Sequence, residues 1–206
     1  MPHGCTPDFA YEQQLWERGH YWVAGVDEVG RGPLAGPVLA AAVLIHPPGA
    51  DVAGVADSKQ LSPLARERLA AVLAERLPYA LGEASVEEID QLGIAVASRL
   101  AMVRALTRLP HQPTAVLVDG FRLPGLLLEQ HPIVDGDAHC WSIAAASVLA
   151  KVARDRLMDD LDQRYPGYGF ARHKGYATAE HRAALARLGP CPVHRRSFAP
   201  LRTEVP

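Results

Sequence analysis

The sequence predicts an α/β fold, in which a central sheet is flanked by helices and followed by a helical C-terminal segment. Short apolar runs of strand length, such as residues 36–45, alternate with longer segments that begin at helix-capping residues. Strands and helices are mixed in one continuous pattern, without an internal repeat or a low-complexity linker. The 206 residues are enough for one domain with a real core, so we expect a single domain over residues 1–206.

The expected strands are short apolar runs that end at glycine, proline or acidic residues. They lie at residues 21–27, 36–45, 79–84, 115–118 and 131–134. Only a short segment rich in glycine and proline separates the first two runs, so these should form a hairpin-like pair.

Capping residues mark the expected helices. Ser62 followed by Pro63 is typical of an N-cap and the first helical position. Ser85 and Glu88 have the spacing of a capping box, and Gly93 marks either a kink or a break between two helices. The predicted helices cover residues 62–77, 85–109, 141–164 and 178–188. The Pro-rich tail after them is expected to pack as extended chain.

Composition is that of a soluble cytoplasmic protein. Apolar residues make up 49% of the chain and charged residues 21%, and no run approaches the roughly 18 apolar residues of a membrane span. The N-terminus lacks the basic start and apolar run of a signal peptide, so we expect no membrane association. The three cysteines are far apart and form no Cys-x-x-Cys pair, which argues against a zinc site or a disulfide framework. Cys140 is expected to be a buried structural thiol.

Charge is unevenly distributed along the chain. The net charge of −2 argues against a simple electrostatic coat for nucleic acid. Residues 1–150 nevertheless carry 10 basic and 17 acidic side chains, whereas residues 151–206 carry 11 basic and 6 acidic ones. An acidic metal-binding body facing a basic grip for a polyanion would explain this asymmetry, and chance would explain it equally well.

Three predicted strands end in acidic residues. Asp27 and Glu28 end the first strand, Asp119 ends the fourth, and Asp135 or Asp137 follows the fifth. Sites in α/β sheets gather at strand ends, where several carboxylates would repel one another unless a cation neutralised them. Oxygen ligands of this kind favour Mg²⁺ or Mn²⁺, and two such ions could hydrolyse a phosphodiester. A single Asp-Gly would more often be a solvated turn, but three strand ends together favour the metal site.

Adjacent carboxylates point to opposite faces of a regular strand, so Asp27 and Glu28 can share a site only where the strand ends. The segment Gly30-Arg31-Gly32 follows at once and provides such a break. Its glycines also expose backbone to a phosphate.

Basic residues in the C-terminal half could bind a nucleic-acid backbone. Ser147, Lys151 and Arg154 are spaced i, i+4 and i+7, which places them on one face of the long helix. Lys174 and Tyr176 lie in a basic cluster beside a glycine, where a ring could stack on a sugar or base. The alternatives are a solvated helix face with Lys151 paired to an acid four residues on, and a surface loop with Tyr176 packed on the body.

Several long motifs together resemble bacterial ribonuclease HII, a type 2 ribonuclease H. The resemblance covers residues 25–198 in family order. The motifs that carry it are Val26-Asp27-Glu28-Val29-Gly30-Arg31-Gly32-Pro33-Leu34-Ala35-Gly36-Pro37-Val38, Asp57-Ser58-Lys59-Gln60-Leu61-Ser62, Val118-Asp119-Gly120, Ser142-Ile143-Ala144-Ala145-Ala146-Ser147-Val148-Leu149-Ala150-Lys151-Val152-Ala153-Arg154-Asp155 and His173-Lys174-Gly175-Tyr176-Ala177-Thr178.

The resemblance implies a ribonuclease H fold with a five-stranded mixed sheet, a core over about residues 20–165 and a substrate-gripping segment over about residues 166–206. It implies hydrolysis of the RNA strand of RNA–DNA hybrids and incision 5′ of single ribonucleotides in duplex DNA, which leaves 3′-hydroxyl and 5′-phosphate ends. The family's four metal-binding and catalytic acids map onto Asp27, Glu28, Asp119 and Asp137. Asp137 is preferred to Asp135 because it follows a glycine and stands ten residues before Ser147.

The resemblance also assigns the substrate contacts. Gly30-Arg31-Gly32 resembles the family's sensor of the ribose 2′-hydroxyl, and Tyr176 resembles the tyrosine that stacks on the adjacent deoxyribose. The remaining phosphate or substrate contacts that it suggests are Lys59, Ser147, Lys151, Arg154 and Lys174.

Other interpretations remain beside this one. The sister family ribonuclease HIII usually has glutamate as its fourth acid and an additional N-terminal domain, whereas this chain has Asp137 and only 26 residues before Asp27. A non-catalytic binder of RNA–DNA hybrids with the same fold is the rival from another class, and a nuclease or transposase relative with broad DNA activity is a second. Nothing demands more than a monomer.

Overall fold

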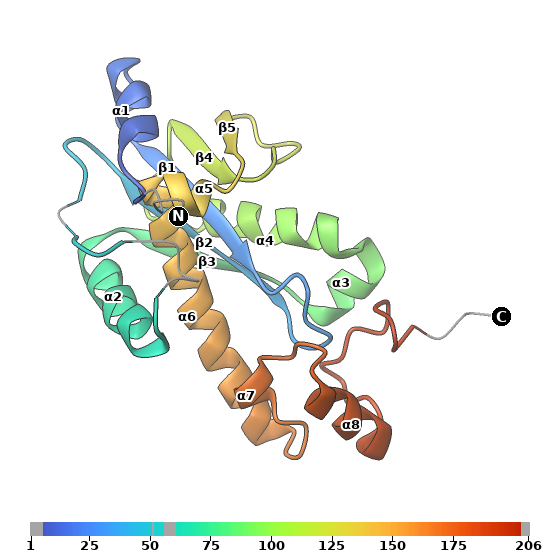
Figure 1. The fold of residues 1–206 in the computed structure, drawn as a ribbon. Coiled ribbons are helices and arrows are strands. Elements are labelled where there is room, and N and C mark those ends of the chain that lie inside the picture. Colours follow the sequence, from blue (N-terminus) through green and yellow to red (C-terminus); the bar gives the residue numbers. More distant parts are fainter. Residues whose placement is uncertain (1–5, 51, 56–60, 203–206) are drawn as a thin grey trace, which may run out of the picture.

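A mixed five-stranded sheet is the centre of the computed structural model, which describes residues 6–50, 52–55 and 61–202. The strand order is β3-β2-β1-β4-β5 (Figure 1). β1 pairs with β2, and β2 with β3, in antiparallel fashion, whereas β1–β4 and β4–β5 are parallel. The bounds are β1 Val23–Val29, β2 Val38–Ile45, β3 Tyr79–Ala84, β4 Ala115–Asp119 and β5 Glu129–Ile133. The predicted fold class and the hairpin-like first pair are therefore confirmed.

Helices cover both faces of this sheet. Their bounds are α1 Ala10–Glu17, α2 Pro63–Arg76, α3 Val86–Leu92, α4 Ile94–Thr107, α5 Gly136–His139, α6 Trp141–Arg164, α7 Phe170–His173 and α8 Ala179–Leu188. Buried residues of α4 share one core cluster with Ala24 and Val26 of β1, whereas α2 and α6 share another with Ala41 and Val43 of β2. The sheet is thus sandwiched between α4 on one face and α2 with α6 on the other (Figure 1).

The close approach of α6 to the sheet depends on small residues. Its first ten residues are all buried, and Ala144, Ala145 and Ala146 are fully inaccessible to solvent. On the opposite side of the contact, a Cβ atom at Gly25 of β1 would lie 2.3 Å from the backbone carbon of Ser142. Only glycine fits there, so this residue sets the distance between the helix and the strand that carries the first two acids.

The capping residues recognised in the sequence mark most of the observed helix boundaries. Ser62 caps α2, and Ser85 with Glu88 forms the capping box of α3. Gly93, with φ +78°, separates α3 from α4, so the chain breaks into two helices here instead of kinking. Thr178 caps α8.

Several boundary predictions were wrong. β1 continues to Val29 instead of ending at the acids, and β5 begins two residues before the predicted run. The helices α1, α5 and α7 were not predicted, because α5 and α7 have only four residues each and α1 lacks a side-chain cap. The tail after α8 forms turns, not extended chain, over its described residues.

The C-terminal segment packs at the far end of α6 (Figure 1). Met158 and Leu161 of α6 form a small core cluster with Tyr168, Phe170 and Ala184. Ala35, from the loop between β1 and β2, belongs to the same cluster. This packing joins the segment to the loop that follows the first two acids. No helix of the described chain is both long and apolar enough to cross a lipid bilayer.

Candidate active site

Three acidic residues meet where β1 and β4 lie side by side. Asp27 and Glu28 belong to β1, and Asp119 is the last residue of β4. One carboxylate oxygen from each lies within 4.8 Å of the others. The parallel register pairs Val26 with Val118, so it places Asp27 directly beside Asp119. The sequence prediction that strand ends gather these acids is therefore confirmed for three of them.

The structure corrects the reason why adjacent carboxylates share one site. The strand does not end at the acids, because Asp27 and Glu28 remain in register with Ala41 and Ala40 of β2. Only the pairing with β4 stops, after Val26. From that point β1 is unpaired on its β4 side in the described sheet, and there a carboxylate oxygen of Asp27 and one of Glu28 lie within 4.8 Å of each other. The backbone amide of Glu28 also donates a hydrogen bond of 2.7 Å to Oδ1 of Asp27, which fixes that carboxylate along the strand.

Asp137 lies close to this cluster but outside its 4.8 Å limit. It is buried on the short helix α5, and its charge contributes to raising the pKa of Asp27. The amide of Gly136 donates a 2.8 Å hydrogen bond to Oδ1 of Asp119, so α5 is tied to the cluster. Asp135, in contrast, is exposed and lies outside the helix with φ +51°. This arrangement favours Asp137 as the fourth acid, and its role as a ligand remains a prediction.

The carboxylates of the site lie in an environment that disfavours their ionised forms, and a bound cation would neutralise their charges. Burial, followed by the charges of Asp119 and Glu28, raises the pKa of Asp27 well above its usual range, and a hydrogen bond from Ser147 opposes this. Burial and Asp119 also raise the pKa of Glu28, whereas Arg31 lowers it. Oε2 of Glu28 is buried and has no hydrogen-bond partner among the described residues. Clustered carboxylates with an unsatisfied buried oxygen fit a hard divalent ion such as Mg²⁺ or Mn²⁺.

The turn after β1 lies against the C-terminal segment. Gly30 has φ +93°, a conformation that favours glycine, and Gly32 is exposed. A Cβ atom at Gly32 would lie 3.5 Å from Cε1 of Tyr176, whose side chain is 49% exposed. Arg31 forms a 3.2 Å ion pair with Glu28 and also lies over the ring of Phe121. The structure therefore brings Gly32 of the turn close to Tyr176, and the sensor roles of the turn and the ring stay predictions.

Comparison with known proteins decides the family. The ribonuclease HII family model matches residues 24–201. The chain belongs to the ribonuclease HII family. It is 57% identical to ribonuclease HII of Moorella thermoacetica over 92% of both chains, and 54% identical to that of Paracoccus denitrificans over 95% of this chain and 93% of the other. The crystal structure of ribonuclease H2 from Pyrococcus horikoshii has a TM-score of 0.72 and 28% identity, and the match covers 88% of this chain and 95% of that one.

Membership confirms the resemblance to ribonuclease HII and favours it over ribonuclease HIII. Ribonuclease HII enzymes are divalent-metal-dependent endoribonucleases of the type 2 ribonuclease H class. This chain is therefore an enzyme that acts on nucleic acid. Family membership argues against the alternative of a non-catalytic protein that binds RNA–DNA hybrids.

The expected row of phosphate-binding side chains on α6 is not a free surface in the described structure. Ser147 is buried and bonds to Asp27. Lys151 pairs with Asp155, the alternative weighed from the sequence. Arg154 is only 1% exposed, and its guanidinium donates hydrogen bonds to backbone carbonyls. The burial of Arg154 does not support a phosphate contact, which stays a prediction, because helical periodicity places a residue on a face without saying whether that face is covered.

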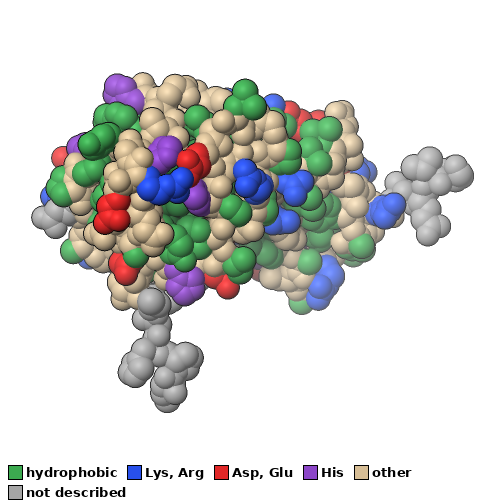
Figure 2. Space-filling view, turned by 90° about the horizontal axis from the view of Figure 1, so that it is seen from above, with side chains coloured by type: hydrophobic (Ala, Val, Ile, Leu, Met, Phe, Trp, Pro, Cys, Tyr) green, Lys and Arg blue, Asp and Glu red, His purple; other side chains and the backbone are tan. Residues whose placement is uncertain are grey.

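The remaining expected contacts lie elsewhere. Lys174 has φ +50° and binds Asp159 and, at 3.1 Å, the carbonyl of Asp155. Lys59 lies outside the described residues. On the face shown in Figure 2, acidic, basic and histidine side chains are interspersed with apolar ones.

Two buried charged residues near the site were not identified from the sequence. Arg195, in the Pro-rich tail, is fully buried against the loop after β1. Glu12 of α1 is fully buried and accepts hydrogen bonds from Cys140 and from the amide of Ser142, which anchors the start of α6. Cys140 is fully buried, as predicted. No spacing or motif marks Arg195 or Glu12, because each contacts residues more than a hundred positions away.

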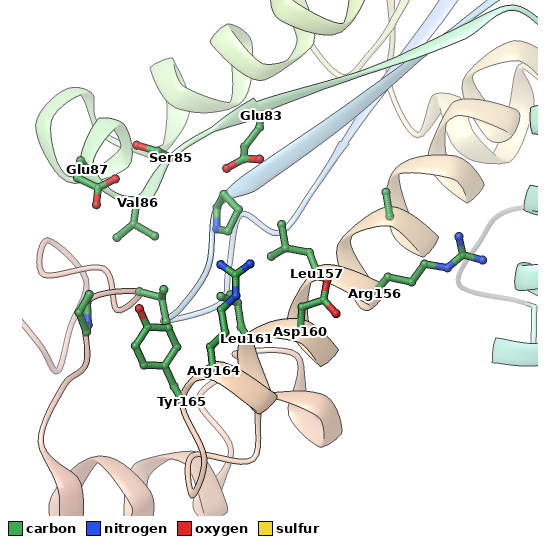
Figure 3. Close-up of a pocket in the computed structure, with 14 residues that line it drawn as sticks. Glu83, Ser85, Val86, Glu87, Arg156, Leu157, Asp160, Leu161, Arg164 and Tyr165 are labelled. Atoms are coloured by element: carbon green, nitrogen blue, oxygen red, sulfur yellow. The ribbon is translucent and has the colours of Figure 1, made fainter.

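A hollow of about 500 Å³ lies apart from the acids (Figure 3). Glu83, Ser85 and Glu87 line one side of it, and Arg156 and Tyr165 belong to the α6 side. None of the four acids lines it. The candidate active site therefore does not include that hollow.

Proposed function

We propose that the chain hydrolyses the RNA strand of RNA–DNA hybrids and incises duplex DNA on the 5′ side of a single embedded ribonucleotide. The products would carry 3′-hydroxyl and 5′-phosphate ends. The observation that supports this most is that the cluster of Asp27, Glu28 and Asp119 lies on the strand that leads directly into the Gly30-Arg31-Gly32 turn, and that Gly32 of this turn lies next to Tyr176. A phosphodiester at the acids would have its neighbouring sugars at the turn and the ring.

The acids would hold two divalent ions, Mg²⁺ or Mn²⁺. Asp27, Glu28, Asp119 and Asp137 are the proposed ligands. Such ions supply an activated water and charge stabilisation of the leaving 3′-oxygen. Ser147 orients Asp27 by its hydrogen bond, and the amide of Gly136 orients Asp119. No side chain of the site needs to act as a dedicated general base.

The turn and the aromatic ring would select the sugar. The backbone amides of Arg31 and Gly32 donate no hydrogen bond to any described residue, so both are available to a ribose or a phosphate. A 2′-hydroxyl can accept and donate hydrogen bonds, and this distinguishes RNA from DNA at a given position. The half-exposed ring of Tyr176 would stack on the neighbouring deoxyribose. Lys151 and Lys174 would contact phosphates by exchanging their present acidic partners, and the enzyme would act as a monomer.

Incision of a labelled DNA duplex that contains one ribonucleotide tests this proposal. We expect a metal-dependent cut on the 5′ side of the ribonucleotide, no cut with chelator and none in the all-DNA duplex. Binding without cutting under either ion would contradict the proposal, as would equal cutting of the all-DNA duplex.

Replacement of Tyr176 tests the reading of the junction. Tyr176→Ala should reduce kcat/KM on the single-ribonucleotide duplex by about tenfold, since stacking contributes about 1–3 kcal/mol per base, and should affect a long hybrid less. Tyr21→Ala is the matched control, because Tyr21 is 64% exposed and does not contact the site in the described structure. An equal loss on both substrates would argue against a junction role.

A further inference from the structure

Two buried arginines lie beneath the turn that follows β1. Arg154 of α6 is 1% exposed and Arg195 of the tail is 0% exposed. Among the described residues, neither forms an ion pair with a carboxylate. Their hydrogen-bond acceptors are all backbone carbonyls. Two cations held inside a protein in this way need an explanation, because desolvation of a charge is costly.

Arg195 binds both ends of the loop at residues 30–37. Its guanidinium donates to the carbonyl of Gly30 at 2.6 Å and of Arg31 at 2.8 Å. It also donates to Gly36 at 2.8 Å and to Pro37 at 3.2 Å. One rigid planar group therefore closes the loop by joining its first carbonyls to its last ones, which a lysine ammonium could not do.

Arg154 supports the same loop from α6. It donates to the carbonyl of Ala35 at 3.2 Å and, more weakly, to that of Pro37 at 3.4 Å. Gly30 packs directly on its guanidinium, since a Cβ atom there would lie 2.1 Å from Nε. The position of the turn is therefore defined by contact as well as by hydrogen bonds.

Arg154 also connects the turn to the segment that carries Tyr176. Arg154 donates at 3.0 Å to the carbonyl of Lys174. The amide of Leu34 donates at 2.8 Å to Gly175, where a Cβ atom would lie 2.7 Å from the carbonyl oxygen of Ala35. The turn and the aromatic ring are consequently held at one fixed separation.

Because five carbonyls of the loop are turned inward to the guanidinium groups, the turn presents amides outward. Of the loop amides without a described partner, those of Gly30 and Ala35 belong to buried residues, whereas those of Arg31 and Gly32 belong to exposed ones. The two buried positive charges lie directly behind these donors, and this favours an anion or an electron-rich oxygen in front of them.

We propose that Arg154 and Arg195 are positioning residues, which hold the Gly30-Arg31-Gly32 turn and Tyr176 in the geometry that discriminates a ribonucleotide next to a deoxyribonucleotide. This inference rests on the proposed function. Arg154 and Arg195 do not touch the reacting phosphate, so their effect should be on substrate selectivity and not on the metal site.

Arg195→Lys tests this role, and Arg196→Lys is the matched control, because the neighbouring Arg196 is exposed. For Arg195→Lys we expect the ratio of kcat/KM on a single-ribonucleotide duplex to that on a long hybrid to fall by about tenfold. Binding of Mn²⁺ to the acids, measured by calorimetry, should stay within about twofold of the wild-type value. An unchanged ratio would overturn the proposal, and so would an equal loss on both substrates together with lost Mn²⁺ binding, since that pattern indicates a merely structural role.

Amide hydrogen exchange on the wild-type chain gives a second test that does not depend on folding of a variant or on cleavage. With Ca²⁺ in place of the catalytic ion, the amides of Arg31 and Gly32 should become protected by a single-ribonucleotide duplex and not by the same duplex in DNA. Equal protection by both duplexes would overturn the positioning role. If the wild-type chain bound in this selective way but did not incise, the proposed function alone would fail.

Discussion

We expect a buried histidine pair to make the stability of this enzyme sensitive to acid. His194 and His181 are both inaccessible to solvent, and their Nε2 atoms lie 3.0 Å apart. The amide of Cys191 donates to Nδ1 of His194, and Nδ1 of His181 faces the carbonyl oxygen of Tyr176 at 2.9 Å. If Nδ1 of His194 accepts from Cys191, Nε2–H of His194 donates to His181, whose Nδ1–H donates to Tyr176. Both rings must be neutral, because a further proton on His181 would place two N–H groups against each other.

The size of the effect on the free energy of unfolding follows from the lowered pKa of His194. Burial, and then the neighbouring His181, lowers the pKa of His194 from 6.5 to about 4. Between these values the unfolded chain binds a proton that the folded chain does not, so stability falls as the pH decreases. At about 1.4 kcal/mol per pKa unit, this group reduces the free energy of unfolding by about 2–3 kcal/mol between pH 7 and pH 4.5. The effect is absent above the unfolded pKa of 6.5 and is complete below about pH 4.

Urea unfolding at the two pH values, on the wild-type chain and on His194→Gln, measures this contribution. The variant should be less stable at pH 7, since it loses the paired hydrogen bond, but its stability should fall by about 2 kcal/mol less on acidification. His139→Gln is the control, because His139 is exposed and should leave the pH dependence unchanged. An equally steep decrease for wild type and His194→Gln would refute the assignment of neutral, buried rings.

Three further predictions concern the acids and the sheet. Asp137→Asn should lower turnover by about a hundredfold or more, whereas Asp135→Asn should stay within about twofold, as measured by steady-state incision; the reverse order would assign the fourth ligand to Asp135. Gly82→Ala should reduce the free energy of unfolding by about 3 kcal/mol in urea, because its Cβ atom would lie 2.1 Å from the carbonyl oxygen of Ala101; a loss below about 1 kcal/mol would show that α4 moves away easily. Addition of Mn²⁺ should raise the Tm of the metal-free enzyme, because it neutralises the carboxylates around Asp27, and chelator should reverse the rise; an unchanged Tm at saturating Mn²⁺ would contradict an ion site at these acids.

Local signals predicted most of the fold because they act over a few residues. The capping box at Ser85 and Glu88 and the apolar run of α6 each depend on neighbours within one or two helical turns. Two strand-end acids, Asp27 and Asp119, were likewise predicted to meet, because parallel pairing places adjacent strand ends together.

The parts of the fold and of the site that depend on contacts between distant residues could not be predicted from the sequence. The spacing of Arg154 correctly places it on a regular helix, but the loop at residues 30–37 that covers its side chain comes from more than a hundred positions earlier. Arg195 has no periodic context, and its importance depends on carbonyls of the loop at residues 30–37. The short helix α5 has only four residues, and one backbone bond from Gly136 to Asp119 ties it to the cluster. Such contacts are set by tertiary packing and leave no local pattern.

The central claim is that the buried carboxylates bind the ions that cut the substrate, and Asp27→Asn tests it most directly. Single-turnover incision of a duplex with one ribonucleotide should slow by several orders of magnitude. The metal-free variant should be at least as stable as the wild-type chain, because burial and neighbouring charges disfavour the ionised Asp27 that asparagine replaces. Near-normal incision by a folded Asp27→Asn enzyme would contradict the account.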